Sequence, residues 1–229
     1  MTPFLHTARF YITAAEIGGL PNTSVPEVAF VGRSNAGKST CINTLAQQKR
    51  LAFASKTPGR TQQINYFSVG FSKQTSGYLV DLPGYGYAAV PKYEKARWQQ
   101  FLADYLKTRD QLTGLVLITD SRIGLTPLDL QLLDFVATQQ KPVHVLIAKI
   151  DKLSGNERRD AVARTQDALG DYLAQQNLTI DVSMQTFSAT KKDGLADLAA
   201  HIEGWMGFDA AAPRLPPLLP EGLSAPEIS

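Results

Sequence analysis

The sequence predicts an α/β domain in which helices cover both faces of a mostly parallel, six-stranded sheet with one antiparallel strand. Short apolar runs alternate with longer amphipathic stretches, which is the pattern of strands joined by helices. In chain order, the expected strands cover 28–32, 64–71, 78–82, 115–119, 143–148 and 180–187. The first, fourth and fifth are apolar throughout, as central parallel strands are. The connector between the second and third is too short for a parallel crossover, so these two strands form an antiparallel hairpin.

The expected helices occupy the stretches between the strands. In chain order they cover 39–47, 92–108, 127–138, 156–175 and 194–206. The second of them places Trp98, Leu102, Tyr105 and Leu106 along one face. We therefore expect Trp98 to be a core residue rather than a platform on which RNA bases stack.

Length and composition indicate one globular domain with short extensions. The chain has 229 residues, of which 44% are apolar and 19% charged. We divide it into an N-terminal arm or edge strand (1–25), the main domain (26–206) and a flexible tail (207–229) that contains five of the 13 prolines. No apolar run is long enough to cross a membrane, no secretory signal is visible, and the single cysteine, Cys41, excludes an internal disulfide. These features predict a cytoplasmic protein, and we expect it to be a monomer.

Basic residues gather in two places, although the net charge of +2 predicts no particular partner. The clusters are Lys49, Arg50, Lys56 and Arg60, and then Lys92, Lys95 and Arg97. Such clusters can contact RNA phosphates, but a solvated charged face is the simpler interpretation.

A phosphate-binding loop follows the first expected strand. The run Gly32-Arg33-Ser34-Asn35-Ala36-Gly37-Lys38-Ser39 has the Gly-x4-Gly-Lys-Ser spacing and leads into a helix. Its glycines let backbone amides approach a phosphate, and the helix N-terminus adds free N–H groups. Lys38 is expected to reach the β- and γ-phosphates and the Ser39 hydroxyl to bind Mg²⁺.

A second motif, Asp81-Leu82-Pro83-Gly84, follows the third expected strand. An aspartate at the carboxyl end of a strand near a phosphate loop can hold Mg²⁺, usually through water. The amide of Gly84 can meet the γ-phosphate.

A third and a fourth motif are suited to reading the base. Ala148-Lys149-Ile150-Asp151 closes the fifth expected strand, and Phe187-Ser188-Ala189 follows the sixth. The Asp151 carboxylate can accept hydrogen bonds from the ring N–H and the exocyclic amine of guanine, whereas adenine offers no matching donors. The Lys149 stem can lie over the base, and the Ser188–Ala189 backbone can donate to the guanine carbonyl. Taken alone, Asp151 could equally be a helix N-cap; together the four motifs indicate a GTP site.

The polar stretch 49–63 is expected to be a mobile loop that responds to the nucleotide. Within it we assign to the nucleotide site the residues Gly59, Arg60, Thr61, Gln62 and Gln63. Thr61 is expected to join Ser39 and Asp81 as a Mg²⁺ ligand when GTP is bound. Thr57 is the competing candidate, but Thr61 lies nearer the following strand.

Together these motifs resemble those of the EngB (YihA/YsxC) family of bacterial ribosome-biogenesis GTPases. The runs FVGRSNAGKST, SKTPGRTQQINYF, LVDLPGYGYA and FSATKKDGL carry the resemblance, which extends from Phe10 to Met206. It implies a Ras-like fold, GTP or GDP as ligand, Mg²⁺ as cofactor and slow GTP hydrolysis. It also implies a role in maturing the large ribosomal subunit, with rRNA and ribosomal proteins as partners, and a requirement for normal cell division.

Three positions qualify this interpretation. Ala148 stands where the family usually has Thr, and losing that hydrogen bond should cost on the order of 1 kcal/mol of guanine affinity. Tyr85 occupies the position at which Ras-type sites place a water-orienting glutamine, so hydrolysis should be slow without a partner. Asn35 matches GTPases that use K⁺ as a fixed positive charge, although it could instead bond within its own loop. The catalytic assignment is therefore Lys38, Thr61 and Asn35.

Two other classes of function remain. A P-loop kinase or ATPase would prefer ATP, which the base-reading motifs disfavour. A nucleotide-gated RNA- or protein-binding module, with incidental hydrolysis, is compatible with Tyr85.

Overall fold

The computed structural model describes residues 4–53, 63–71, 74–85 and 92–208, and for 92–95 and 97 the backbone alone. The strands are β1 (Arg9–Ala14), β2 (Glu27–Gly32), β3 (Ile64–Val69), β4 (Gly77–Asp81), β5 (Leu112–Asp120), β6 (Val143–Ala148) and β7 (Val182–Thr186). The helices are α1 (Lys38–Leu45), α2 (Lys92–Thr108), α3 (Pro127–Thr138), α4 (Gly155–Gln175) and α5 (Leu195–Trp205). Short 3₁₀ turns lie at η1 (Leu5–Thr7), η2 (Ile17–Gly19) and η3 (Ile150–Lys152).

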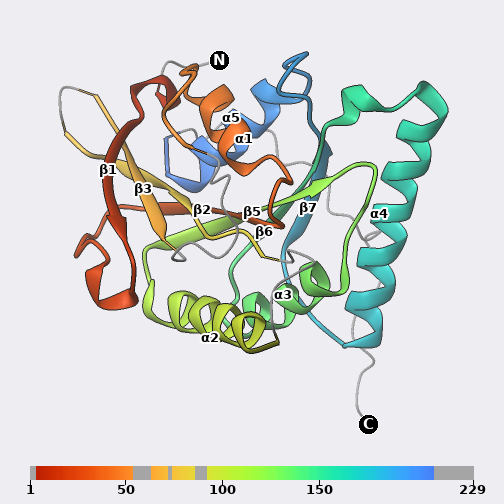
Figure 1. Cartoon of the computed structure of the whole chain (residues 1–229), viewed down its shortest axis with the longest axis horizontal. Coiled ribbons are helices and arrows are strands. Elements are labelled where there is room, and N and C mark those ends of the chain that lie inside the picture. The colour runs from red at the N-terminus through yellow and green to blue at the C-terminus, as the bar shows by residue number, and fades with distance from the viewer. Residues whose placement is uncertain (1–3, 54–62, 72–73, 86–91, 209–229) are drawn as a thin grey trace, which may run out of the picture.

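The seven strands form one sheet in the order β1-β3-β4-β2-β5-β6-β7 (Figure 1). β3 pairs antiparallel with both β1 and β4, and the other neighbouring pairs are parallel. The predicted α/β class and the single antiparallel strand are thus confirmed. The six predicted strands are all present, and β1 adds a seventh at the edge, from the segment that we expected to be an arm or an edge strand. Five of its six residues are exposed or half-buried, so it lacks the apolar pattern of a buried strand.

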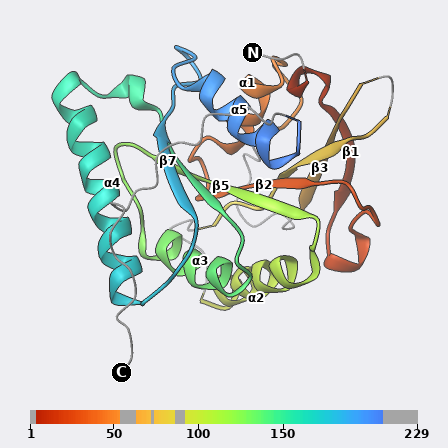
Figure 2. The ribbon, with the colours of Figure 1, turned by 180° about the vertical axis from the view of Figure 1, so that it is seen from behind.

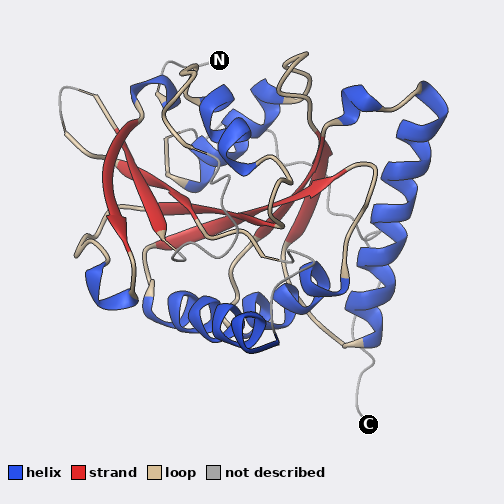
Figure 3. Cartoon of the chain, viewed as in Figure 1, coloured by secondary structure: helices blue, strands red, loops and turns tan. Residues whose placement is uncertain are grey.

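Helices cover both faces of the sheet (Figures 1 and 3). One core contains Ile42 of α1 and Leu198 of α5, and the other contains Trp98 of α2, Leu133 of α3 and Leu169 of α4. The view from behind shows the same two layers, with β1 at one edge of the sheet and α4 beside the other (Figure 2). Trp98 is 4% exposed, so the prediction that it is a core residue is confirmed.

The ends of several elements differ from those expected. β3 stops at Val69, β7 runs from Val182 to Thr186, and β5 is longer than the apolar run that indicated it. In the described part of the chain, no helix has the length and apolar character that a membrane span requires. Most of the tail (209–229) lies outside the described residues.

The carboxyl ends of β2, β4, β5 and β6 lie at the same edge of the sheet, because these strands are parallel neighbours. The order changes direction around β2, which has β4 on one side and β5 on the other. In open α/β sheets ligands bind at such a point. The motifs of the sequence follow these strand ends.

Candidate functional site

The loop between β2 and α1 has the geometry of a phosphate cradle. Asn35 and Gly37 adopt positive φ angles of 64° and 122°, which turn the chain sharply before α1 begins at Lys38. The amides of the first helical turn lack partners within the helix and can meet an anion. The Lys38 ammonium donates to the Gly32 carbonyl at 3.1 Å, so it lies over the loop.

Asp81, at the end of β4, faces this cradle. The Ser39 hydroxyl donates to Asp81 Oδ2 at 3.4 Å, and Asp81 is 6% exposed. Its other oxygen, Oδ1, is buried without a hydrogen-bond partner in the described part of the chain. Burial raises the pKa of Asp81 to about 6, although Lys38 and Ser39 oppose this effect; burial also lowers the pKa of Lys38. A free carboxylate oxygen beside a serine hydroxyl fits a Mg²⁺ site.

Gly84 approaches the phosphate loop so closely that a side chain there would crowd the loop. A Cβ added there would lie 2.8 Å from Lys38 Nζ and 3.1 Å from the backbone nitrogen of Ser34. The next residue, Tyr85, accepts a hydrogen bond from the Ser34 amide at 2.9 Å through its carbonyl. The backbone of this motif therefore lies against the phosphate loop.

The Tyr85 side chain is anchored to two helices. Its hydroxyl donates to Asp129 of α3, its ring lies 4.3 Å from that of Trp98 in α2, and it is 5% exposed. The Trp98 indole in turn donates to the Pro83 carbonyl at 3.1 Å. Burial and the neighbouring Asp129 raise the pKa of Tyr85 well above its usual value. Tyr85 thus joins the Asp81–Gly84 motif to α2 and α3, with its hydroxyl already engaged.

Asp151 is held in place by the motif that follows β7. The Ser188 hydroxyl donates to Asp151 Oδ1 at 2.7 Å, and this bond lowers the pKa of the carboxyl. The Ile150 amide donates to the Phe187 carbonyl at 3.2 Å, which joins the two loops. The alternative role of Asp151 as a helix N-cap is excluded, because Ser154 caps α4 and Asp151 lies within η3.

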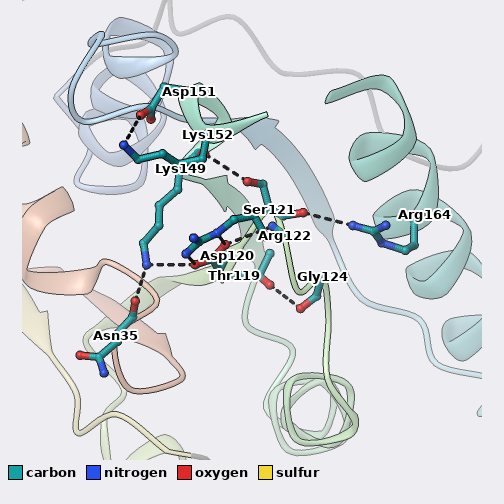
Figure 4. A network of polar contacts seen from close by, with 10 residues as sticks. All are labelled: Asn35, Thr119, Asp120, Ser121, Arg122, Gly124, Lys149, Asp151, Lys152 and Arg164. Atoms are coloured by element: carbon teal, nitrogen blue, oxygen red, sulfur yellow. Dashed lines mark hydrogen bonds and ion pairs between the residues drawn. The ribbon is translucent and has the colours of Figure 1, made fainter. Parts of the chain in front are cut away.

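Lys149 connects the base-reading loop to the phosphate loop (Figure 4). Its ammonium donates to the Asn35 carbonyl at 2.6 Å and to Asp120 Oδ2 at 3.0 Å. Asp120 also accepts from the Arg122 guanidinium, at 2.9 and 2.6 Å, and these cations hold its pKa well below the usual range. Ser121 completes the link, since its amide donates to the Ala148 carbonyl at 2.9 Å and its hydroxyl to the Lys149 carbonyl at 3.2 Å.

This network shows how the two loops are joined although Ala148 lacks a hydroxyl. The sequence interpretation missed Asp120 and Ser121. The signal that could have found Asp120 is the one used for Asp81, an aspartate at the end of an apolar strand. A pocket of about 210 Å³ adjoins the network, and Asn35, Asp120 and Lys149 are among its lining residues.

The structure brings most of the predicted residues to one edge of the sheet. The residues so placed are Gly32, Arg33, Ser34, Asn35, Ala36, Gly37, Lys38, Ser39, Asp81, Leu82, Pro83, Gly84, Ala148, Lys149, Ile150, Asp151, Phe187, Ser188 and Ala189. Gln63 is exposed just before β3. Thr57, Gly59, Arg60, Thr61 and Gln62 lie outside the described residues, so their roles remain predictions.

The family model described as "50S ribosome-binding GTPase" matches residues 27–149. A probable GTP-binding protein EngB of Ralstonia nicotianae is 49% identical over 214 residues, which are 93% of this chain and 92% of that protein. A protein of the same description from Burkholderia pseudomallei is 52% identical over 211 residues, 92% of this chain and 96% of its own. The fold is similar to a crystal structure of a probable GTP-binding protein EngB, with a TM-score of 0.60 and 21% identity over 79% of this chain and 98% of the other.

Proposed function

This chain belongs to the EngB family of GTP-binding proteins, and on that premise we propose that it is a nucleotide-dependent switch in the assembly of the large ribosomal subunit. It hydrolyses GTP slowly and needs a partner for full activity. The observation that carries the proposal is a pair of carboxylates at two ends of one site. Asp81 faces Ser39 and the phosphate loop, and Asp151 is held by Ser188.

Each end of the site has a separate task. Lys38 and the first amides of α1 bind the β- and γ-phosphates. Ser39 and Asp81 would hold Mg²⁺, which would offset the negative charge on the phosphate oxygens, and Thr61 would join them in the GTP state. Asp151 accepts from the ring N–H and the exocyclic amine of guanine, and the Ser188–Ala189 backbone donates to its carbonyl. These contacts to the guanine base favour binding of GTP over ATP.

Slow hydrolysis follows from the position of Tyr85. Its hydroxyl is engaged by Asp129, and it has no amide with which to orient water. A partner or a bound cation must therefore supply the missing groups. Depletion of the protein is expected to disturb cell division as a consequence of defective ribosome assembly.

We propose K⁺ as one source of that help. The Asn35 side chain is exposed, and it makes no hydrogen bond to any residue that the structure describes. The alternative, in which it bonds within its own loop, is less well supported for that reason. Turnover measured in K⁺ and in Na⁺, for the wild type and for Asn35→Ala, tests this role. Faster turnover in K⁺ that Asn35→Ala abolishes is expected, and equal rates in the two salts would exclude it.

The ribosomal role is tested by capture of large-subunit precursor particles with the tagged full chain, loaded with a non-hydrolysable GTP analogue, with GDP or with no nucleotide. Preferential capture in the GTP state is expected. Equal capture in all three states would refute the proposal that the protein acts as a nucleotide-dependent switch. The buried Tyr85 also keeps a second candidate open, a nucleotide-gated binding module whose hydrolysis is incidental. It predicts that particles are released on nucleotide exchange even when hydrolysis is blocked.

We further propose that the protein is a cytoplasmic monomer. Size-exclusion chromatography with light scattering measures the mass, and a mass near 25.0 kDa is expected. A mass twice as large would contradict it.

A further inference from the structure

Exposed aromatic and basic residues occur on the edge strand β1 and on the segment after α1, which a hydrogen bond from Gln48 joins to the start of β1. We define the β1–α1 surface as Arg9, Phe10 and Tyr11 of β1 together with Lys49, Arg50 and Phe53 of the segment after α1. All six are exposed, and the three aromatic residues are 57%, 52% and 73% exposed for Phe10, Tyr11 and Phe53. Exposed apolar side chains that gather in one region, rather than being scattered singly, are typical of contact sites.

Hydrogen bonds fix the two halves of this surface to each other. The Gln48 amide group donates to the Ala8 carbonyl at 2.7 Å, which ties the segment after α1 to the start of β1. Asn43 of α1 accepts from the Leu51 and Ala52 amides at 3.0 and 2.8 Å and donates to the Ala52 carbonyl at 2.8 Å. The surface is therefore preformed, and α1 connects it directly to the phosphate loop.

The sequence around the segment after α1 carries positive charges and no negative ones. Between positions 27 and 81 the sequence contains seven Lys and Arg residues and no Asp or Glu. In the described part of the chain no ion pair joins Arg9, Lys49 or Arg50 to a carboxylate. These cations are thus free to meet an anionic partner.

We propose that the β1–α1 surface binds a single-stranded segment of RNA. Lys49, Arg50 and Arg9 contact backbone phosphates, and the exposed rings stack on unpaired bases. Phe10 lies on the α1 side of the sheet, next to Phe67, and Tyr11 lies on the α2 side, next to Tyr78. An RNA strand that crosses the edge at β1 contacts both.

A protein strand is the other occupant to consider, because β1 is an edge strand. The register of β1 shifts between Phe10 and Ile12, so Tyr11 forms a bulge. A bulge and a charged residue are features that disfavour the addition of a further strand. Strand addition would also leave Lys49 and Arg50 without a role. Double-stranded RNA offers phosphates but hides the faces of its bases, so it would not use the rings.

The experiment measures binding of a fluorescent 12-nucleotide RNA to the full chain by anisotropy, at several salt concentrations, with the same strand annealed to its complement as a second probe. Lys49→Ala/Arg50→Ala removes two phosphate contacts. It should lower the slope of log affinity against log salt by about 1.4, which corresponds to about 25-fold weaker binding at 0.1 M salt. Phe53→Ala should weaken binding about fivefold or more and leave the slope unchanged. The matched control is Arg158→Ala/Arg159→Ala, which removes two charges from α4 beside the opposite edge of the sheet (Figure 1).

Three results would overturn the proposal. The first is equal affinity of the protein for the single strand and for the duplex. The second is an equal loss of RNA affinity in the α4 control. The third is that Lys49→Ala/Arg50→Ala binds ribosomal particles fully but does not bind free RNA. The last result would indicate a protein partner. All these variants change exposed or half-buried side chains, and unchanged GDP affinity and melting temperature would show that they fold.

The inference rests on the proposed function, but the two can fail separately. If the wild type captures particles in a GTP-dependent manner and the surface variants do so equally well, the proposed switch is supported and the proposed RNA-binding surface is refuted. If capture does not depend on the nucleotide, the proposed switch is refuted. The titration with free RNA then still tests whether the β1–α1 surface binds RNA.

Discussion

Removal of the Asp120 carboxylate should weaken guanine nucleotide binding although Asp120 belongs to none of the recognised nucleotide motifs. Asp120 accepts from the Lys149 ammonium at 3.0 Å, and Lys149 also holds the Asn35 carbonyl at 2.6 Å. In Asp120→Ala the ammonium keeps only one of these two partners. The Lys149 stem, which we expect to lie over the base, then becomes less well fixed.

The size of the effect follows from the burial of the pair. A hydrogen bond to a charged group contributes about 1.5–3 kcal/mol. The Asp120 side chain is 7% exposed but that of Lys149 is 32% exposed, so water replaces part of the lost bond. A loss of about 1–1.5 kcal/mol remains, which corresponds to a Kd for GDP about 5- to 13-fold higher.

The assay is a titration with fluorescent GDP at constant salt, combined with a thermal melt to show that each variant is folded. Arg122→Ala is the matched control, because Arg122 contacts the same carboxylate but is 53% exposed and leaves the pair of Asp120 and Lys149 intact. Its Kd should stay within about twofold of the wild type. A normal Kd in Asp120→Ala, or an equal loss in Arg122→Ala, would refute the reasoning.

Three further predictions concern other parts of the fold. Asp151→Asn should favour xanthine over guanine nucleotides, because its amide can donate to the second carbonyl of xanthine; unchanged guanine preference in a competition titration would contradict this. Burial lowers the pKa of His144 from 6.5 to about 3, so the unfolded chain binds a proton that the folded chain does not. The contribution of His144 to stability is then full well above pH 6.5 and should fall by about 2 kcal/mol at pH 5, as measured by urea unfolding. His144→Gln should lack this part of the loss and keep only the part from His201, whose pKa burial also lowers. Tyr85→Phe removes the donor to buried Asp129 Oδ1, while Oδ2 keeps its bonds from Thr126, and should cost about 1–3 kcal/mol; Tyr172→Phe, at a half-buried position, should cost less. Equal melting temperatures in the two variants would rule out that difference.

The phosphate loop and the base-reading motif could be predicted because short runs of sequence determine both. In the phosphate loop, glycines and a following helix create the cradle without help from distant residues. Asp151 was recognisable because it closes an apolar strand in the right order after the phosphate loop. Its partner Ser188 lies 37 residues further along the chain, yet its own motif also identified it.

The features that the sequence left open or did not predict depend on distant contacts. The segment of β1 could be an arm or an edge strand, because its side chains are exposed on both faces and its place in the sheet comes from pairing with β3, about 55 residues away. The direction of the Tyr85 side chain is determined by Asp129, 44 residues further along. Asp120 stands alone at the end of β5, so its role became visible only when β6 brought Lys149 beside it.

The loops of the nucleotide site are connected to both faces of the sheet. Gly84 lies against the phosphate loop, and the next residue, Tyr85, is bound to α2 and α3 on one face. On the other face, α1 begins at the phosphate loop and holds the segment that ends at Phe53 through Asn43. A shift of Gly84 on nucleotide binding would therefore reach α2 and α3 through Tyr85, whereas Lys49, Arg50 and Phe53, which lie on the α1 side, would keep their proposed RNA contacts.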